Sequence, residues 1–419
     1  MMKTILLIVT LDTKGPEAQF LKSILERQGV SVLTMNAGIF PAECGEGDFT
    51  RQQVALAAGR RVDELIAAND KGAAIGVMIE GAAKLTRSLY DGGQIHGVLS
   101  IGGAQGTLIG TAAMRSLPLG VPKLMLTTMA SGKRQFDLYV GTSDITLMHS
   151  VVDFFGLNAL LRQVLTNAAA AMAGMVQMDK VRQESKTRIA ITIYGTTTPA
   201  GSRIVSLLHD KGYEVVAFHP NGAGGQAMEE MIRARVFDGV IDLTTHDLMD
   251  ELAGGAHAGG PNRLEAASAM GIPQVVAPGS IDYIVTGRFS ELSRTFRKRK
   301  TMIHNPEMTF VQPSDREMAR LGRIMADKLN RSRGSTVVMI PMAGFSYPNY
   351  KGRSLHNPAG TAAFVQSLQA HIQSGVPVRL LPMHINDGPF ATAVVKEFSK
   401  LMERRLVRHQ PRKDKAAAV

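Results

Sequence analysis

The stretch LIVTLDTKGPEAQFLKSILERQGVSVLTMNAG, residues 7–38, decides the fold. It begins with a short apolar run, continues with apolar residues at helical spacing and ends with a second apolar run, which is the pattern of a strand, a helix and a strand. Both apolar runs are continuous, as in parallel strands whose two faces are covered. The same rhythm recurs along the chain. The sequence therefore predicts an α/β fold with doubly wound, mainly parallel sheets.

The same stretch has a second copy further along the chain. Residues 7–38 align without a gap with AITIYGTTTPAGSRIVSLLHDKGYEVVAFHPN, residues 190–221. A second match pairs GVPKLMLTTMASG, which starts at Gly120, with GIPQVVAPGSIDY, which starts at Gly271. These matches are explained either by a duplication or by convergence on a common sequence pattern of strand, turn and helix. In both cases we expect two similar α/β halves, with a cleft between them.

The boundary between the subdomains is predicted in a polar, strand-poor segment, residues 176–188. We place the N-terminal subdomain at residues 1–180 and the C-terminal subdomain at residues 181–419, ending in a basic tail. The most apolar long stretch, residues 151–178, is interrupted by polar and charged residues, so no membrane span is expected. A single cysteine, Cys44, excludes a disulfide scaffold and fits a cytoplasmic location.

The net charge of +11 is concentrated in two segments of the 419-residue chain. Residues 288–300 carry six basic residues and one acid, and residues 400–415 carry seven basic residues and two acids, so each contributes +5. Few aromatic residues accompany these charges, whereas nucleic-acid surfaces interleave the two kinds. We therefore expect no nucleic-acid partner; the segments are solvated, or the first contacts phosphate.

Loops rich in Gly, Thr and Ser follow the predicted strands of the first half. In open parallel sheets, ligands bind beyond the carboxyl ends of the strands. Backbone amides of a glycine-rich turn at a helix N-terminus hold anions, and hydroxyl groups add donors. The loops together predict a phosphate cradle, with tight packing alone as the alternative. The turn GGAQGT, residues 102–107, matches neither the P-loop pattern nor GxGxxG.

A competing motif in the second half points to a nicotinamide cofactor. Gly222, Gly224 and Ala227 satisfy GxGxxA before a predicted helix, and Asp242 lies twenty residues after Gly222. However, this turn follows the second strand of its half, whereas the dinucleotide fingerprint follows the first. An enzyme that uses NAD(P) is therefore kept as an alternative.

Polar side chains gather after the predicted strands of the second half. Histidine is the readiest general acid or base near neutral pH, and arginine holds anionic substrates. Solvated loop histidines are the alternative, and a zinc site is disfavoured because no HExxH spacing occurs. The predicted catalytic residues are His219, His246, His384 and Asp387, and the predicted substrate-binding residues are His257, Arg263, His304 and Asn305.

Several motifs carry a family resemblance along nearly the whole chain, among them TLDTKGPE, IGGAQGT, TTMASG, GTSDIT, HPNGAGGQAME, APGSIDY and MHINDGPFA. They resemble the family of ATP-binding proteins similar to the N-terminal domain of the tomato mosaic virus resistance protein. The resemblance implies two Rossmann-like subdomains, ATP bound with magnesium, and a homodimer or higher homo-oligomer. It does not imply a reaction, and the antiviral role belongs to the plant relative.

The resemblance and the loops together assign a nucleotide site to the first half. Magnesium, which needs few carboxylates, is expected to meet Asp12 or Asp144 through water. The predicted nucleotide contacts are Thr13, Lys14, Gly38, Gly102, Gly103, Gly106, Thr107, Thr127, Thr128, Ser131, Gly132, Gly141 and Thr142. The function expected is that of an ATP-binding enzyme or regulator that acts on a small anionic metabolite in the cleft. A non-catalytic, ATP-dependent protein-interaction module is the alternative.

Overall fold

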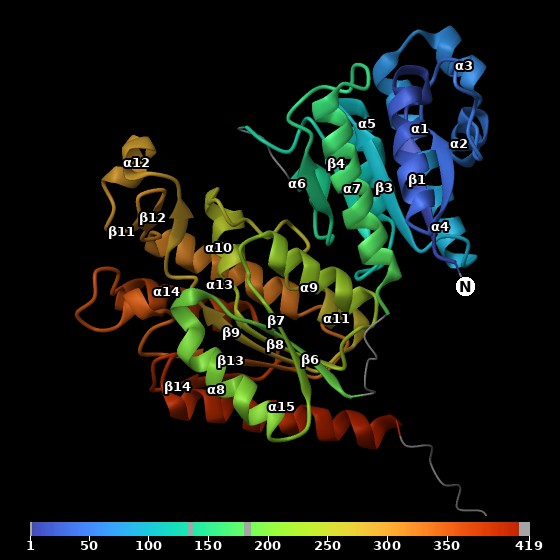
Figure 1. Ribbon diagram of the computed structural model, residues 1–419. Coiled ribbons are helices and arrows are strands. Elements are labelled where there is room, and N and C mark those ends of the chain that lie inside the picture. The colour runs from blue at the N-terminus through green and yellow to red at the C-terminus, as the bar shows by residue number, and fades with distance from the viewer. Residues whose placement is uncertain (1, 133–136, 180–185, 410–419) are drawn as a thin grey trace, which may run out of the picture. The chain divides into compact units, whose positions relative to one another are not determined.

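The structure, a computed structural model, describes residues 2–132, 137–179 and 186–409 (Figure 1). It divides into unit 1, Met1–Gln183, and unit 2, Glu184–Val419. Each unit contains a parallel sheet flanked by helices, which confirms the predicted α/β fold class. The cleft between the units stays a prediction.

Unit 1 is built on a five-stranded sheet in the order β2-β1-β3-β4-β5, in which every pair of neighbours is parallel. The strands are β1 (Thr4–Val9), β2 (Ser31–Asn36), β3 (Gly97–Gly102), β4 (Lys123–Thr127) and β5 (Thr146–His149). The helices are α1 (Leu11–Arg27), α2 (Arg51–Ala57), α3 (Val62–Ala68), α4 (Lys71–Asp91), α5 (Ala104–Arg115), α6 (Asp137–Val140) and α7 (Ala159–Gln177).

The continuous apolar run of β1 supplies two cores, one on each face of the sheet. Ile5 and Leu7 pack with α1 and α7, while Leu6 and Ile8 pack with α2, α3, α4 and α5. Successive residues of a strand point to opposite faces of the sheet. When both faces are covered, all of these side chains are buried, so polar residues do not alternate with apolar ones. This is why residues 5–9 are all apolar.

Helix α7 is long and apolar enough to cross a membrane by length and composition alone. No other helix in the described ranges meets that criterion. Seven of its residues, including Leu161 and Leu165, are buried in the core of unit 1. Packing against the sheet therefore accounts for the apolar residues on its buried face.

Unit 2 contains a six-stranded parallel sheet in the order β14-β13-β9-β8-β6-β7 and a three-stranded antiparallel sheet in the order β10-β12-β11. The strands are β6 (Arg188–Thr192), β7 (Glu214–Phe218), β8 (Gly239–Thr244), β9 (Gln274–Gly279), β10 (Ile284–Thr286), β11 (Thr301–Asn305), β12 (Met308–Val311), β13 (Thr336–Pro341) and β14 (Val378–Leu381). The helices are α8 (Thr198–His209), α9 (Ala223–Arg233), α10 (His246–Ala253), α11 (Ala266–Met270), α12 (Arg294–Arg297), α13 (Asp315–Leu329), α14 (Pro358–His371) and α15 (Gly388–His409), with 3-10 turns η1 (Gly195–Thr197), η2 (Phe289–Glu291) and η3 (Tyr347–Asn349).

The two parallel sheets repeat one strand order. The order β2-β1-β3-β4 of unit 1 recurs as β7-β6-β8-β9 in unit 2, and the aligned stretches 7–38 and 190–221 fall on corresponding strands. In both sheets the second strand of the unit pairs with one side of the first strand, and the third strand pairs with its other side. The switch points between β1 and β3, and between β6 and β8, are the places where this architecture binds ligands.

The basic segment at residues 288–300 lies between β10 and β11 and comprises η2 and α12. Part of its charge is paired within unit 2. Arg288 makes two hydrogen bonds to Glu307, of 2.8 and 2.7 Å, and Arg299 makes two to Glu317, of 2.7 and 3.1 Å. These pairs reduce the charge that the segment presents to a partner.

Candidate functional sites

A cavity of about 620 Å³ opens at the carboxyl edge of the sheet in unit 1. Its walls come from the loops after β1, β2 and β3, together with α3 and α4. It therefore lies at the switch point between β1 and β3, and its size is that of a small-molecule site. One part is polar and the other is lined by apolar residues: Leu65, Ile66, Ala74, Ile75, Met78 and Ile109.

Asp12 ties together the loops that form the polar part. Its Oδ2 atom accepts the backbone N–H groups of Ile39 and Phe40 at 3.3 and 3.2 Å. Its Oδ1 atom is buried and has no hydrogen-bond partner among the described residues. A Cβ atom on Gly38 would lie 2.7 Å from the Asp12 carboxyl carbon, so a larger residue there would have to displace the Asp12 carboxylate. Buried Asn36 braces both loops by accepting the N–H groups of Leu11 and Gly38 at 3.2 and 2.9 Å.

The N-terminus of α5 forms another wall of the polar part. Gly103 is its N-cap residue and, as a glycine, has no side chain that could cap the first amides of the helix. A Cβ atom on Gly102 would lie 2.9 Å from Gly106 Cα, so the end of β3 packs closely against the first helical turn. The first amides of a helix have no partner within it and favour an anion. Gly103 and Gly106 line the cavity, so these amides are near any anion bound there.

The structure separates the residues predicted to contact the nucleotide, together with the two predicted magnesium contacts, into three groups. Those that line the cavity are Asp12, Thr13, Lys14, Gly38, Gly103 and Gly106. A second group is buried behind the loop: Gly102, and Thr107 and Thr127, whose hydroxyl oxygens lie 2.6 Å apart. The residues Thr128, Ser131, Gly132, Gly141, Thr142 and Asp144 are not part of the cavity lining.

Asp144 lies at the other edge of the sheet. Its carboxylate accepts a 2.6 Å hydrogen bond from Lys123 Nζ, at the start of β4, and a 2.7 Å bond from the Gly120 amide. The motif GTSDIT precedes β5 instead of following β4, so its loop belongs to the amino edge. Of the two predicted magnesium contacts, only Asp12 lies at the cavity.

In unit 2, an aromatic cluster occupies the corresponding switch point between β6 and β8. Tyr194 follows β6, is 6% exposed and stacks on His219, which follows β7, with ring centroids 4.6 Å apart. The Tyr194 hydroxyl lies 2.6 Å from His257 Nδ1. Burial raises the pKa of Tyr194, and Asp250 and Asp247 raise it further, so the hydroxyl stays protonated near neutral pH. The cluster brings together three of the predicted site residues: His219, His246 and His257.

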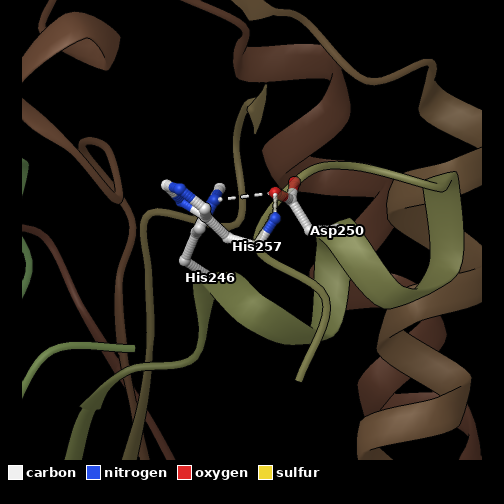
Figure 2. Close-up of side chains that lie close together, drawn as sticks. All are labelled: His246, Asp250 and His257. Carbon is white, nitrogen blue, oxygen red and sulfur yellow. Dashed lines mark hydrogen bonds and ion pairs between the residues drawn. The ribbon is translucent and has the colours of Figure 1, made fainter. Parts of the chain in front are cut away.

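His246, the first residue of α10, is completely buried. Its Nδ1 atom lies 2.7 Å from the carbonyl oxygen of Ser280, and because a carbonyl only accepts, Nδ1 carries a proton. Ser280 holds this carbonyl with a left-handed backbone, φ +60°, which costs a residue other than glycine about 1–3 kcal/mol. The His246 Nε2 atom faces Asp250, one helical turn away, at 3.4 Å from Oδ2 (Figure 2). The Asp250 carboxylate also accepts the backbone N–H groups of His257 and Val285, at 2.9 and 3.0 Å.

Arg263, predicted to bind substrate, is instead held inside unit 2. Its side chain is fully buried. It donates to Asp247 at 2.7 Å, to both carboxylate oxygens of Asp242 at 2.5 and 2.7 Å, and to Glu229 at 3.4 Å. Burial raises the pKa of Asp247 to about 6, although Arg263 lowers it. Because its donors are directed at these carboxylates, Arg263 stabilises the loop between α10 and α11 in which it lies.

Of the other predicted residues of unit 2, His304 is joined to the aromatic cluster through its ring, which stacks on Phe310, and Phe310 in turn stacks on Tyr283 beside His246. His384 follows β14 and stacks on Tyr350, and its Nε2 atom lies 3.0 Å from the carbonyl oxygen of Ser346. Asp387 accepts the His384 backbone N–H at 2.8 Å and so shapes the same turn. His304 and Asn305 end β11, in the antiparallel sheet.

The GxGxxA turn has a packing explanation. A Cβ atom on Gly224 would lie 2.0 Å from the His219 carbonyl oxygen, and one on Gly222 would lie 2.8 Å from the Ala258 carbonyl oxygen. Asp242 is 1% exposed and is bound by Arg263 and by the Thr192 hydroxyl. Its carboxylate is therefore not available to a ribose, which weakens the nicotinamide alternative.

Three residues that organise these sites were missing from the predicted set: Asn36, Tyr194 and Asp250. Asn36 and Tyr194 were detectable, since each ends or follows a predicted strand. Asp250 stands four residues after His246, the spacing that places two side chains on one face of a helix. That signal depends on knowing that α10 begins at His246.

Comparison with known proteins gives a match over both units. The model of the N-terminal domain of the uncharacterised protein family UPF0261 matches residues 3–181, and that of its C-terminal domain matches residues 186–402. A UPF0261 protein from Clostridium tetani is 38% identical over 96% of this chain and 100% of its own length. The ToMV resistance protein Tm-1(GCR237) of Solanum lycopersicum is 32% identical over 98% of this chain, which spans 57% of the tomato protein. These matches confirm the resemblance seen in the motifs.

A third relative, a UPF0261 protein from Rhizobium meliloti, is 34% identical over 95% of this chain and 98% of its own length. Among solved structures, a UDP-N-acetylglucosamine 2-epimerase from Rickettsia bellii aligns with 97% of this chain and 98% of its own at 12% identity and a TM-score of 0.25. That score is too low to support an argument on function.

Proposed function

The chain belongs to the uncharacterised protein family UPF0261, and from the cavity in unit 1 we propose that it binds ATP with magnesium at the switch point between β1 and β3. The observation that supports this most is the division of the cavity into a polar and an apolar part. Amides of α5 and the Lys14 side chain suit phosphates, and the apolar walls from α3 and α4 suit a base.

The residues present also fit a magnesium ion. Mg²⁺ keeps several waters and uses one or two carboxylates together with substrate phosphates. Asp12 supplies one carboxylate at the cavity, and its buried Oδ1 atom has no hydrogen-bond partner among the described residues. The ion would neutralise phosphate charge, and the backbone contacts of Oδ2 hold the carboxylate in place.

Isothermal titration calorimetry with MgATP tests the proposal. Replacing Lys14 with Ala removes a charged donor, worth about 1.5–3 kcal/mol for a hydrogen bond to a charged group, and should weaken binding roughly 10- to 100-fold. Lys84→Ala is the matched control, because exposed Lys84 pairs with Glu80 on α4 and does not line the cavity. Wild-type chain that gives no binding heat with MgATP, or Lys14→Ala binding as tightly as wild type, would contradict the proposal.

We further propose that the chain is an enzyme acting on a small anionic metabolite. Exposed His219, stacked on buried Tyr194, suits general acid–base chemistry better than a passive interaction surface. ATP consumption should be stimulated by anionic metabolites and lost in His219→Ala, whose side chain is exposed. Consumption that ignores both the metabolites and this variant would favour the non-catalytic module.

A further inference from the structure

We propose that His246, Asp250 and His257 of unit 2 form a binding site for a divalent transition metal, with Zn²⁺ as the best match. One ligand atom from each residue lies within 4.8 Å of the other two. Two imidazoles and one carboxylate form a donor set used by catalytic zinc sites. The site is independent of the nucleotide proposal, because it lies in the other unit.

The strongest observation is the His246 Nε2 atom. It is completely buried and makes no hydrogen bond within the described part of the chain. Because Nδ1 donates to Ser280, a neutral His246 has its lone pair on Nε2, directed toward a carboxylate. Two buried acceptors that face each other are unfavourable unless a cation or a proton lies between them.

The distance between these acceptors has the size expected for two metal ligands. Zn–N and Zn–O bonds of about 2.0–2.2 Å at a tetrahedral angle place the two ligand atoms about 3.4 Å apart. His246 Nε2 and Asp250 Oδ2 are separated by 3.4 Å. The third ligand, His257, is half-buried, and the ring must move in by up to about 1.4 Å to close the site.

The surroundings supply the outer contacts that metal ligands need. Ligating histidines donate their other ring nitrogen to a carbonyl or carboxylate, and ligating carboxylates are themselves hydrogen-bonded. His246 donates to Ser280, and Asp250 accepts from the backbone amides of His257 and Val285. Three protein ligands leave one position of a tetrahedral ion open for water or a substrate oxygen.

The test is zinc binding by the full chain, measured by competition with a chromophoric chelator, with metal content determined by mass spectrometry after dialysis. We expect one Zn²⁺ per chain and a loss of at least about 100-fold in affinity for His257→Ala, since outer-contact changes alone cost 10- to 100-fold. His257→Ala keeps the backbone N–H that binds Asp250, and circular dichroism verifies that it is folded. Asp250→Asn is the second variant, with circular dichroism to verify folding.

His371→Ala is the matched control, because His371 is an exposed histidine of α14 in the same unit. It should bind zinc like wild type. Zinc should also raise the melting temperature of wild type and of this control, but not of His257→Ala. Wild-type chain that binds no zinc would leave a proton as the group between His246 and Asp250 and would overturn the proposal. Zinc binding that survives in folded His257→Ala and Asp250→Asn would also overturn it, because the zinc would then bind elsewhere.

Discussion

Replacing Arg263 with Met should destabilise unit 2 severely. The change removes the guanidinium that pairs with Asp242, Asp247 and Glu229, each at most 5% exposed in its side chain. Removing one partner of a buried ion pair costs about 3–5 kcal/mol, because the other charge stays buried without compensation. Domains of this size lose about 2–4 °C per kcal/mol, so the melting temperature should fall by about 6–20 °C.

Differential scanning calorimetry on the full chain measures the loss, with Arg323→Met as the control. Arg323 is 66% exposed and lies 3.8 Å from Asp327 on the same helix, so its pair is worth at most about 1 kcal/mol. Adding Asp242→Asn and Asp247→Asn to Arg263→Met should restore part of the stability by removing the unpaired charges. A variant Arg263→Met that melts within about 2 °C of wild type would refute the structural role and return Arg263 to the substrate site.

Two further predictions follow from single side chains. Gly38→Ala should weaken MgATP binding in calorimetry, because its Cβ atom would lie 2.7 Å from the Asp12 carboxyl carbon and would displace that carboxylate. Unchanged affinity would argue against Asp12 as a contact. Burial alone raises the pKa of Glu317, but hydrogen bonds from Arg299 and Ser314 more than offset this and lower it. Ionised Glu317 therefore adds stability above its unfolded pKa, and this is lost as the pH falls through the lower folded pKa. Glu317→Gln should cost up to about 1 kcal/mol in urea unfolding at pH 7, with the difference vanishing in acid; a constant difference would contradict the assignment.

The fold could be predicted because its signals are local. Continuous apolar runs such as residues 5–9, bounded by turn residues, are typical of strands covered on both faces, and the repeat predicts two similar sheets. The antiparallel sheet of β10, β11 and β12 was not predicted. Its strands are three to five residues long and lie beside the basic segment, where no apolar run of useful length marks them.

The sequence could predict the sites only by showing which residues follow a strand. Position after a strand does not decide whether a side chain turns toward the ligand or back into the core, as Thr107 and Thr127 show by bonding to each other behind the loop. Arg263 lies in a glycine-rich loop that looks exposed in sequence, but its three carboxylate partners come from β8, α9 and α10. Only the tertiary structure brings those segments together.

The aligned residues of the repeat explain how one strand order gives two different sites. Leu11 and Asn36 in unit 1 align with Tyr194 and His219 in unit 2. In unit 1, Asn36 is fully buried and its amide oxygen accepts a hydrogen bond from each of the two loops, which joins them beside the cavity. In unit 2, the two aligned rings stack on each other at the switch point. Backbone groups and space therefore dominate the first site, which suits a whole nucleotide, whereas side chains converge at the second, which suits an ion and the acid–base chemistry of a smaller molecule.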